Sequence, residues 1–186
     1  MDWEDYNYPP CLRIIHYQLS DVEAPDASAA VWWAHVSYVG VVVSLTLNIV
    51  TTVMLAGGEV PDKGVDIFYS IFNFVIVGVV GMYSFYNGYK GIATKRLRLS
   101  FRYVVIQGLM LVFILLAFLL GSGPFNGVTG IKRARDFGGD VGEMWFILTV
   151  IESTLWGLNL GVGAYGLYRV SMNRKHGRPS SSFAIA

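Results

Sequence analysis

The sequence predicts an all-α membrane protein, a four-transmembrane-helix bundle with cytosolic N- and C-termini. Hydrophobic residues make up 54% and charged residues only 15% of the 186 residues, whereas a soluble domain carries about 25% charged residues. The charges are also unevenly placed, because four long stretches of the chain carry almost none. A soluble enzyme domain, a disordered chain and a disulfide-linked secreted module are therefore excluded.

The four stretches predict four membrane spans. Each stretch is longer than the roughly 20 apolar residues that a bilayer-spanning helix needs. We expect the spans at about 31–56, 66–88, 103–122 and 144–168. Together they form a transmembrane domain over 31–168, which follows an acidic cytosolic N-terminal tail, 1–30, and precedes a basic cytosolic C-terminal tail, 169–186.

The orientation follows from the distribution of Lys and Arg, which favour the cytosolic side in short loops. Four spans place the two tails and the loop between spans two and three on one side of the membrane. Ten of the fourteen Lys and Arg residues lie in these three segments, and four lie in the two loops opposite. The asymmetry predicts cytosolic termini, since Asp and Glu contribute little to this rule.

The composition offers little chemistry of its own. A net charge of +1 gives no field that would attract nucleic acid. The single Cys11 permits no intrachain disulfide but is open to acylation. The three histidines are too far apart for a metal site, and the loop at about 121–143 is too short and glycine-rich for a catalytic domain. We therefore expect no enzyme activity, no metal and no cofactor.

Glu152 is the only ionisable carboxylate deep inside a predicted span. A charge at membrane depth costs about 2.5 kcal/mol or more, so such a residue is a candidate functional site. No ionisable partner is expected at the same depth, since His35 lies toward the other end of the bundle. Two interpretations stay open: a proton or ion pathway, and a protonated carboxyl that bonds a polar neighbour such as Asn48.

Small residues indicate where helices pack closely. Ser153, Gly157 and Gly161 recur every four residues in the fourth span, and Gly78 with Gly81 thins the second. The string 161–166 also satisfies the dinucleotide fingerprint G-x-G-x-x-G, but it lies inside a span, so helix packing is the better interpretation. Each span further carries one amide suited to hydrogen bonds across helices, at Asn48, Asn73, Gln107 and Asn159.

The loop between spans two and three is the most basic segment. Its Lys and Arg residues are interleaved with Leu97, Leu99 and Phe101. Each basic residue near an anionic leaflet contributes about 1 kcal/mol to binding. The loop is therefore a candidate lipid-binding site, for phosphoinositides in particular, and the alternative is an orientation signal without a partner. The candidate residues are Lys90, Lys95, Arg96, Arg98 and Arg102.

Several short strings are not explained by hydropathy. They read, in order, Asn7-Tyr8-Pro9-Pro10, His16-Tyr17-Gln18, Lys63-Gly64-Val65-Asp66 and Tyr86-Asn87-Gly88-Tyr89-Lys90. In this order they resemble the secretory carrier membrane proteins, over about residues 7–178. The resemblance implies a tetraspan protein of vesicle trafficking and membrane recycling, in post-Golgi, endosomal or plasma membranes.

The chain departs from that family at two places. The string Ser84-Phe85-Tyr86-Asn87-Gly88 replaces the Cys-Trp, Arg and Pro residues that the family usually carries around its Tyr-Lys pair. The N-terminal Asn-Pro-Phe repeats of longer members do not occur. The resemblance is therefore to a short, divergent member.

We expect a non-enzymatic tetraspan protein of secretory carrier type that contacts the lipid bilayer, phosphoinositides and other membrane proteins, as a hetero- or homo-oligomer. The alternative is an accessory subunit of a larger membrane complex such as a channel or transporter, because glycine-rich helix faces favour close helix partners. A proton or ion pathway at Glu152 is the third interpretation, and it has the least support from the sequence.

Overall fold

The computed structural model describes residues 3–176, and most of this part of the chain is helical. Four of them are long and apolar enough to cross a membrane, which confirms the predicted all-α, four-span fold class. The assignment of the two ends to cytosol and lumen stays a prediction. The elements are η1 (Leu19–Asp21, a short 3-10 helix), α1 (Pro25–Gly57), α2 (Lys63–Ala93), α3 (Leu97–Leu119), α4 (Gly130–Phe137) and α5 (Gly139–His176).

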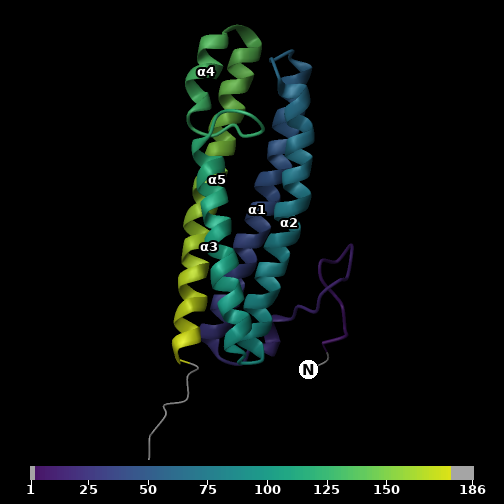
Figure 1. The fold of residues 1–186 in the computed structure, drawn as a ribbon, viewed down its shortest axis with the longest axis vertical. Helices are drawn as coiled ribbons and strands as arrows, with labels where there is room; N and C mark the ends of the chain where they lie inside the picture. Colours follow the sequence, from purple (N-terminus) through teal and green to yellow (C-terminus); the bar gives the residue numbers. More distant parts are fainter. Residues whose placement is uncertain (1–2, 177–186) are drawn as a thin grey trace, which may run out of the picture.

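The four long helices form an up-and-down bundle (Figure 1). Each packs against two neighbours in the cyclic order α1, α2, α3, α5, so that α1 and α3 lie diagonally opposite. The N-terminal segment 3–24, the turn between α2 and α3 and the last turns of α5 lie at one end, which we call the basic end. The turn between α1 and α2 lies with α4 at the other, which we call the α4 end.

Local sequence explains several helix boundaries. Pro25 occupies the start of α1, where its missing backbone N–H has no helical partner to lose. Asp62, just before α2, has a left-handed φ of 66°. The turn between α2 and α3 uses the same conformation at Lys95, with a φ of 54°. It is closed by the N–H of Arg96, which donates to the carbonyl of Gly91 at 2.9 Å.

Segment 120–129 folds back onto the bundle instead of forming an open loop. Gly121 approaches the backbone of Gly130 so closely that a Cβ on Gly121 would lie 1.9 Å from the Gly130 nitrogen. Asn126 within this segment is only 1% exposed. The predicted third span runs to 122, but α3 ends at Leu119, because the chain turns back here through close glycine contacts.

The predicted C-terminal tail begins as helix. α5 continues past 168, the expected end of the fourth span, to His176. Arg178 and the serines 180–182 of the predicted tail lie outside the described residues, as does the side chain of Lys175.

Buried apolar residues form three clusters along the bundle axis. The one at the basic end includes Val31, Phe85 and Tyr89, the central one includes Leu45, Ile114 and Trp156, and the one at the α4 end includes Leu55, Val60 and Trp145. The outward faces are apolar too, with Phe68, Phe72 and Leu109 at 69%, 54% and 67% exposure. Apolar surface of this extent suits contact with lipid chains and not with water.

Candidate functional site

Four basic side chains gather at the turn between α2 and α3, and all four are exposed. Two lie in the turn itself, and the other two, Arg98 and Arg102, lie one helical turn apart at the start of α3. Two leucines complete the lining of an open depression of about 470 Å³. We call this the basic surface, which comprises Lys95, Arg96, Leu97, Arg98, Leu99 and Arg102.

The basic surface forms no ion pair with an acidic side chain of the described residues. Within residues 3–176, its four Lys and Arg side chains take part in no ion pair and no side-chain hydrogen bond. The guanidinium of Arg174 in α5 lies 4.8 Å from the ring centre of Phe101 and adds a cation beside it. Unpaired guanidinium groups bind phosphate oxygens through charge-assisted hydrogen bonds. Leu97, 39% exposed, adds an apolar contact next to these charges.

Lys90, the fifth residue of the predicted lipid-binding set, is placed apart from the other four. Its ammonium donates to the hydroxyl of Tyr86 at 3.2 Å and lies 4.7 Å from the ring centre of Trp3. Lys90 therefore contacts the N-terminal segment and does not line the depression.

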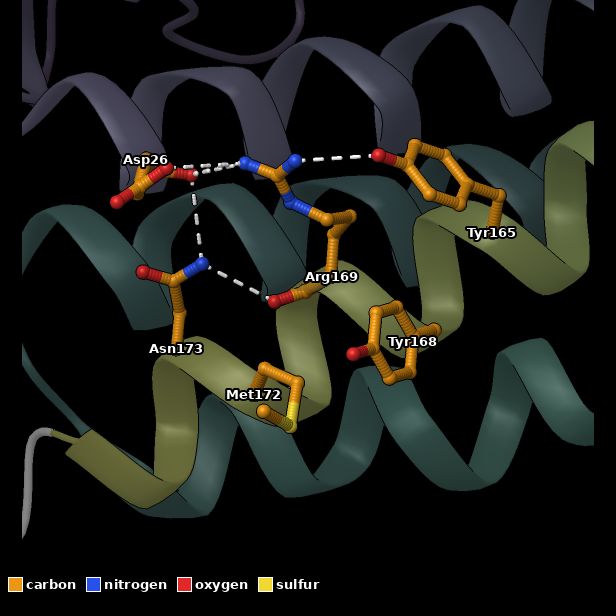
Figure 2. Close-up of a pocket in the computed structure, with 6 residues that line it drawn as sticks. All are labelled: Asp26, Tyr165, Tyr168, Arg169, Met172 and Asn173. Carbon is orange, nitrogen blue, oxygen red and sulfur yellow. Dashed lines mark hydrogen bonds and ion pairs between the residues drawn. The ribbon is translucent and has the colours of Figure 1, made fainter.

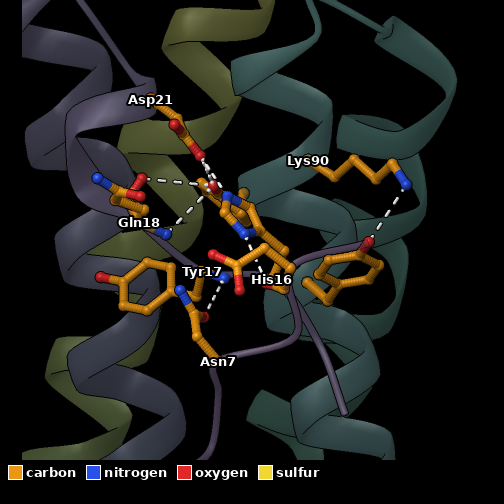
Figure 3. Close-up of polar contacts among 9 residues, drawn as sticks. Asn7, His16, Tyr17, Gln18, Asp21 and Lys90 are labelled. Atoms are coloured by element: carbon orange, nitrogen blue, oxygen red, sulfur yellow. Dashed lines mark hydrogen bonds and ion pairs between the residues drawn. The ribbon is translucent and has the colours of Figure 1, made fainter. Parts of the chain in front are cut away.

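The N-terminal segment 3–24 packs on α2 through a buried hydrogen-bonded group (Figure 3). The imidazole Nε2 of His16 lies 2.7 Å from the carboxylate of Asp21. The hydroxyl of Tyr89 in α2 donates to the same carboxylate and accepts the backbone N–H of Gln18 at 3.2 Å. The segment predicted as a polar tail is thus held to the bundle by polar contacts.

A second contact joins the N-terminal segment to α1. The hydroxyl of Tyr8 is hydrogen-bonded to Nε2 of His35 at 2.9 Å. The Tyr8 ring meets those of Tyr17 and Phe85 edge-on, with centroids 5.4 Å and 6.1 Å away. Edge-to-face pairs of this kind contribute about 0.5–1.5 kcal/mol each beyond burial. His35 therefore belongs to the docking contact of the N-terminal segment.

The ionisation of His16 and Asp21 is mutually stabilised. Burial lowers the pKa of His16, but its bonds to the Asp5 carbonyl and to Asp21 outweigh burial, so that the pKa is raised. Burial likewise raises the pKa of Asp21, but the bonds from Tyr89 and His16 outweigh it, so that the pKa is lowered. Both shifts favour the charged pair.

A shallow pocket at the basic end lies between the start of α1 and the last turns of α5 (Figure 2). Arg169 forms an ion pair with Asp26 at 3.3 Å and donates to the hydroxyl of Tyr165 at 3.1 Å. Asn173 donates to the backbone carbonyl of Asp26 at 3.4 Å. Asp26 is almost fully exposed, and exposed pairs contribute about 0–1 kcal/mol. This pocket joins two helix ends and adds no free charge.

Glu152 is fully buried, and it lies in the half of α5 that begins at Gly139, next to α4. Its carboxylate accepts hydrogen bonds from Asn48 of α1 at 2.7 Å and from Asn126 of segment 120–129 at 3.2 Å. The polar neighbour named from the sequence, Asn48, is therefore present. His35 lies at the basic end, as expected from its place in the sequence.

The residues predicted for helix packing lie in different surroundings. A Cβ at Gly81 would lie 3.3 Å from the ring of Tyr38, and one at Gly157 would lie 3.3 Å from that of Phe118. Ser153 donates to the backbone of Asn126 at 3.2 Å. Gly78 and Gly161 have no heavy atom of another element within 4 Å of a Cβ position. Closer contacts occur at two other glycines of the same bundle, Gly40 and Gly163.

The predicted hydrogen bonds of the span amides are confirmed for three of the four. Asn48 reaches Glu152, Gln107 donates to Ser37 at 3.1 Å, and Asn159 donates to Ser44 at 2.6 Å. Each bond joins two helices.

Sequence reasoning did not identify the pairing of Lys63 with Asp66. Their Nζ and Oδ2 atoms lie 3.2 Å apart, and the two side chains are 5% and 10% exposed. Their i, i+3 spacing could have indicated the pair, but the two residues lie where the sequence predicts a short polar turn.

Cys11 is an exposed free thiol. Within residues 3–176, no three His, Cys, Asp or Glu residues are grouped as metal ligands would be.

A model of the SCAMP family matches residues 5–176 of the chain. Comparisons with curated proteins and with solved structures gave no match. The matched range begins within the docked N-terminal segment and ends with α5, so it contains all of the helices described above.

Proposed function

The chain belongs to the SCAMP family, a family of membrane-trafficking proteins, and from this premise we propose that it acts in vesicle trafficking as a non-enzymatic organiser of lipid and protein. The family membership confirms the resemblance that the sequence strings predict. In the proposal, the basic end faces the cytosol. The basic surface then binds phosphoinositides and other anionic lipid in the cytosolic leaflet.

The observation that supports the proposal is that no acidic side chain in residues 3–176 forms an ion pair with the four cations of the basic surface. The four exposed cations are free to bind an anion through charge-assisted hydrogen bonds, and the two leucines beside them offer an apolar contact. A lipid headgroup supplies phosphate oxygens for the guanidinium groups, and its acyl chains lie beside the leucines. At about 1 kcal/mol for each basic residue, the four together favour anionic over neutral lipid by several orders of magnitude.

The proposal is tested on the full chain in detergent, by native mass spectrometry with added short-chain phosphoinositide or phosphatidylcholine. Arg98→Gln combined with Arg102→Gln removes two charges from the basic surface. Two charges correspond to about 2 kcal/mol, so phosphoinositide binding should weaken about 30-fold, while phosphatidylcholine binding stays unchanged.

Lys132→Gln with Arg133→Gln is the matched control, because it removes two exposed cations at the α4 end. Equal loss of binding in the two double variants would contradict the proposed site. Equal binding of phosphoinositide and phosphatidylcholine by the unmodified chain would also contradict the proposed site.

The accessory-subunit alternative makes a different prediction. A chain that belongs to a larger complex should purify in mild detergent with a stoichiometric partner. Recovery as a lone monomer or homo-oligomer would exclude it, and location at endosomal or Golgi membranes would support the trafficking proposal.

A further inference from the structure

Glu152 lies among hydrogen-bond donors that solvate an ionised carboxylate. Its Oε1 accepts from Asn48 at 2.7 Å and from the indole of Trp156 at 3.4 Å, and its Oε2 accepts from Asn126 at 3.2 Å. All four side chains are at most 1% exposed. Within residues 3–176, no cationic group lies within hydrogen-bond distance of this carboxylate.

An ionised Glu152 would have no ion-pair partner among residues 3–176. Lys63 of α2, 4% exposed, extends to Oδ1 of Asn126 at 3.4 Å, but its ammonium is paired with Asp66 at 3.2 Å. The pair of Lys63 and Asp66 is neutral, which leaves the charge of Glu152 uncompensated. Isolated charges at membrane depth are costly, and in membrane proteins such carboxylates commonly serve proton binding.

Unpartnered polar atoms occur on α1 and α5 between Glu152 and the α4 end, and we call this set the row. Of six buried side-chain N and O atoms without a partner in residues 3–176, four lie in this half of the bundle: Asn48 Oδ1, Thr51 Oγ1, Thr149 Oγ1 and Trp145 Nε1. The residues 145, 149 and 152 share one face of α5 at helical spacing, and 48 and 51 share a face of α1, which packs against it. Buried polar atoms without a protein partner are typically bonded to internal water.

The row begins at a pocket open to the α4 end. This pocket has a volume of about 540 Å³, and Lys63, Asp66, Arg133 and Trp145 are among its lining residues. Toward the basic end, Glu152 is closed off by the central apolar cluster, where Leu45, Ile114 and Trp156 are fully buried. Buried polar side chains toward the basic end form hydrogen-bonded pairs, Asn159 with Ser44 and Gln107 with Ser37. The unpartnered atoms therefore leave a polar path to the carboxylate from the α4 end.

We propose that Glu152 is a proton-binding site that exchanges with the solution at the α4 end and not with that at the basic end. A hydronium ion in the pocket transfers its proton through water along the row to a carboxylate oxygen, which forms one O–H bond and leaves water behind. The groups that share this region are Lys63 and Asp66 from α2, Asp62 before α2 and Arg133 from α4. The titratable residues of α1 and α3 lie in the halves of those helices nearer the basic end. The site is independent of the basic surface.

Infrared difference spectroscopy of the full chain in lipid vesicles tests the proposal. Acidification should produce the carbonyl stretch of a buried carboxylic acid. The band should be lost in Glu152→Gln and shifted in Glu152→Asp, which keeps a carboxyl group. A spectrum without such a band, or one that is unchanged in both variants, would overturn the proposal.

The access route has its own control. Thr149→Val removes one unpartnered hydroxyl at nearly constant volume and should slow exchange of the carboxyl proton for deuterium. Ser84→Ala removes another buried, unpartnered hydroxyl, in α2 toward the basic end, and should leave that rate unchanged. Equal rates in Thr149→Val and the unmodified chain, or equal slowing in both variants, would overturn access from the α4 end.

Discussion

The imidazole of His16 and the carboxylate of Asp21 lie 2.7 Å apart with side-chain exposures of only 4% and 15%. Tyr89 of α2 contacts the same carboxylate, so this pair is a main attachment of the N-terminal segment to the bundle. A buried pair of this kind makes docking of the segment depend on the protonation of both partners.

Docking of the N-terminal segment should be strongest between about pH 4 and 6.5. The raised pKa of His16 gives a contribution that is complete below the ordinary histidine pKa and is lost as pH rises through the raised value. The lowered pKa of Asp21 gives a contribution that is complete above the ordinary aspartate pKa and is lost as pH falls through the lowered value. Hydrogen exchange of amides 3–24, corrected for its intrinsic pH dependence, measures docking.

In His16→Gln, docking should no longer weaken as pH rises, because the imidazole that titrates there is gone. Docking should still weaken as pH falls, because Asp21 remains. Docking that weakens equally with rising pH in this variant and in the unmodified chain would show that another group controls it.

Tyr8→Phe should weaken docking of the same segment by about 1 kcal/mol, the usual contribution of one hydrogen bond. The phenylalanine ring keeps the aromatic contacts and loses only the bond to His35. Tyr6→Phe is the matched control, because Tyr6 is 52% exposed. Amide exchange in 3–24 should therefore accelerate about fivefold in Tyr8→Phe and stay unchanged in Tyr6→Phe.

The four spans could be predicted because lipid requires long charge-free helices, and Lys and Arg are confined to their ends. The docking of residues 3–24 could not be predicted from hydropathy, because that segment is polar and its contacts are specific bonds such as that of Tyr8 with His35. The strings that carried the family resemblance nevertheless contain Tyr8, His16 and Tyr89, which make these contacts. The short strings that hydropathy does not explain were therefore the one sequence feature that pointed to the docking residues.

The packing of segment 120–129 against the bundle could not be predicted for a different reason. Its glycines and Pro124 predict an open loop, since such residues favour turns. In the structure the same glycines let two backbones touch and bring Asn126 to Glu152. The glycine and proline content of a segment predicts that it turns, but it does not predict which distant residues the turn will contact.

Gly121→Ala should destabilise the protein by about 1–3 kcal/mol, the usual cost of overpacking. The added methyl group would clash with the backbone of Gly130, which cannot rotate away as a side chain can. Gly161→Ala is the control, because a methyl group there meets nothing within 4 Å and alanine favours helix by up to about 1 kcal/mol. Thermal unfolding in detergent should rank Gly161→Ala at or above the unmodified chain and Gly121→Ala below it.

Lys63→Met should be among the most destabilising single changes at the α4 end. It leaves Asp66 buried without its partner and removes the donor to the Gly123 carbonyl at 3.0 Å. Breaking a buried pair on one side costs about 3–5 kcal/mol, whereas replacing both partners by apolar residues is often nearly neutral. Adding Asp66→Leu to Lys63→Met should therefore restore most of the lost stability. Thermal unfolding of the two single variants and the double variant measures the coupling, and purely additive losses would show that the pair does not act as a unit.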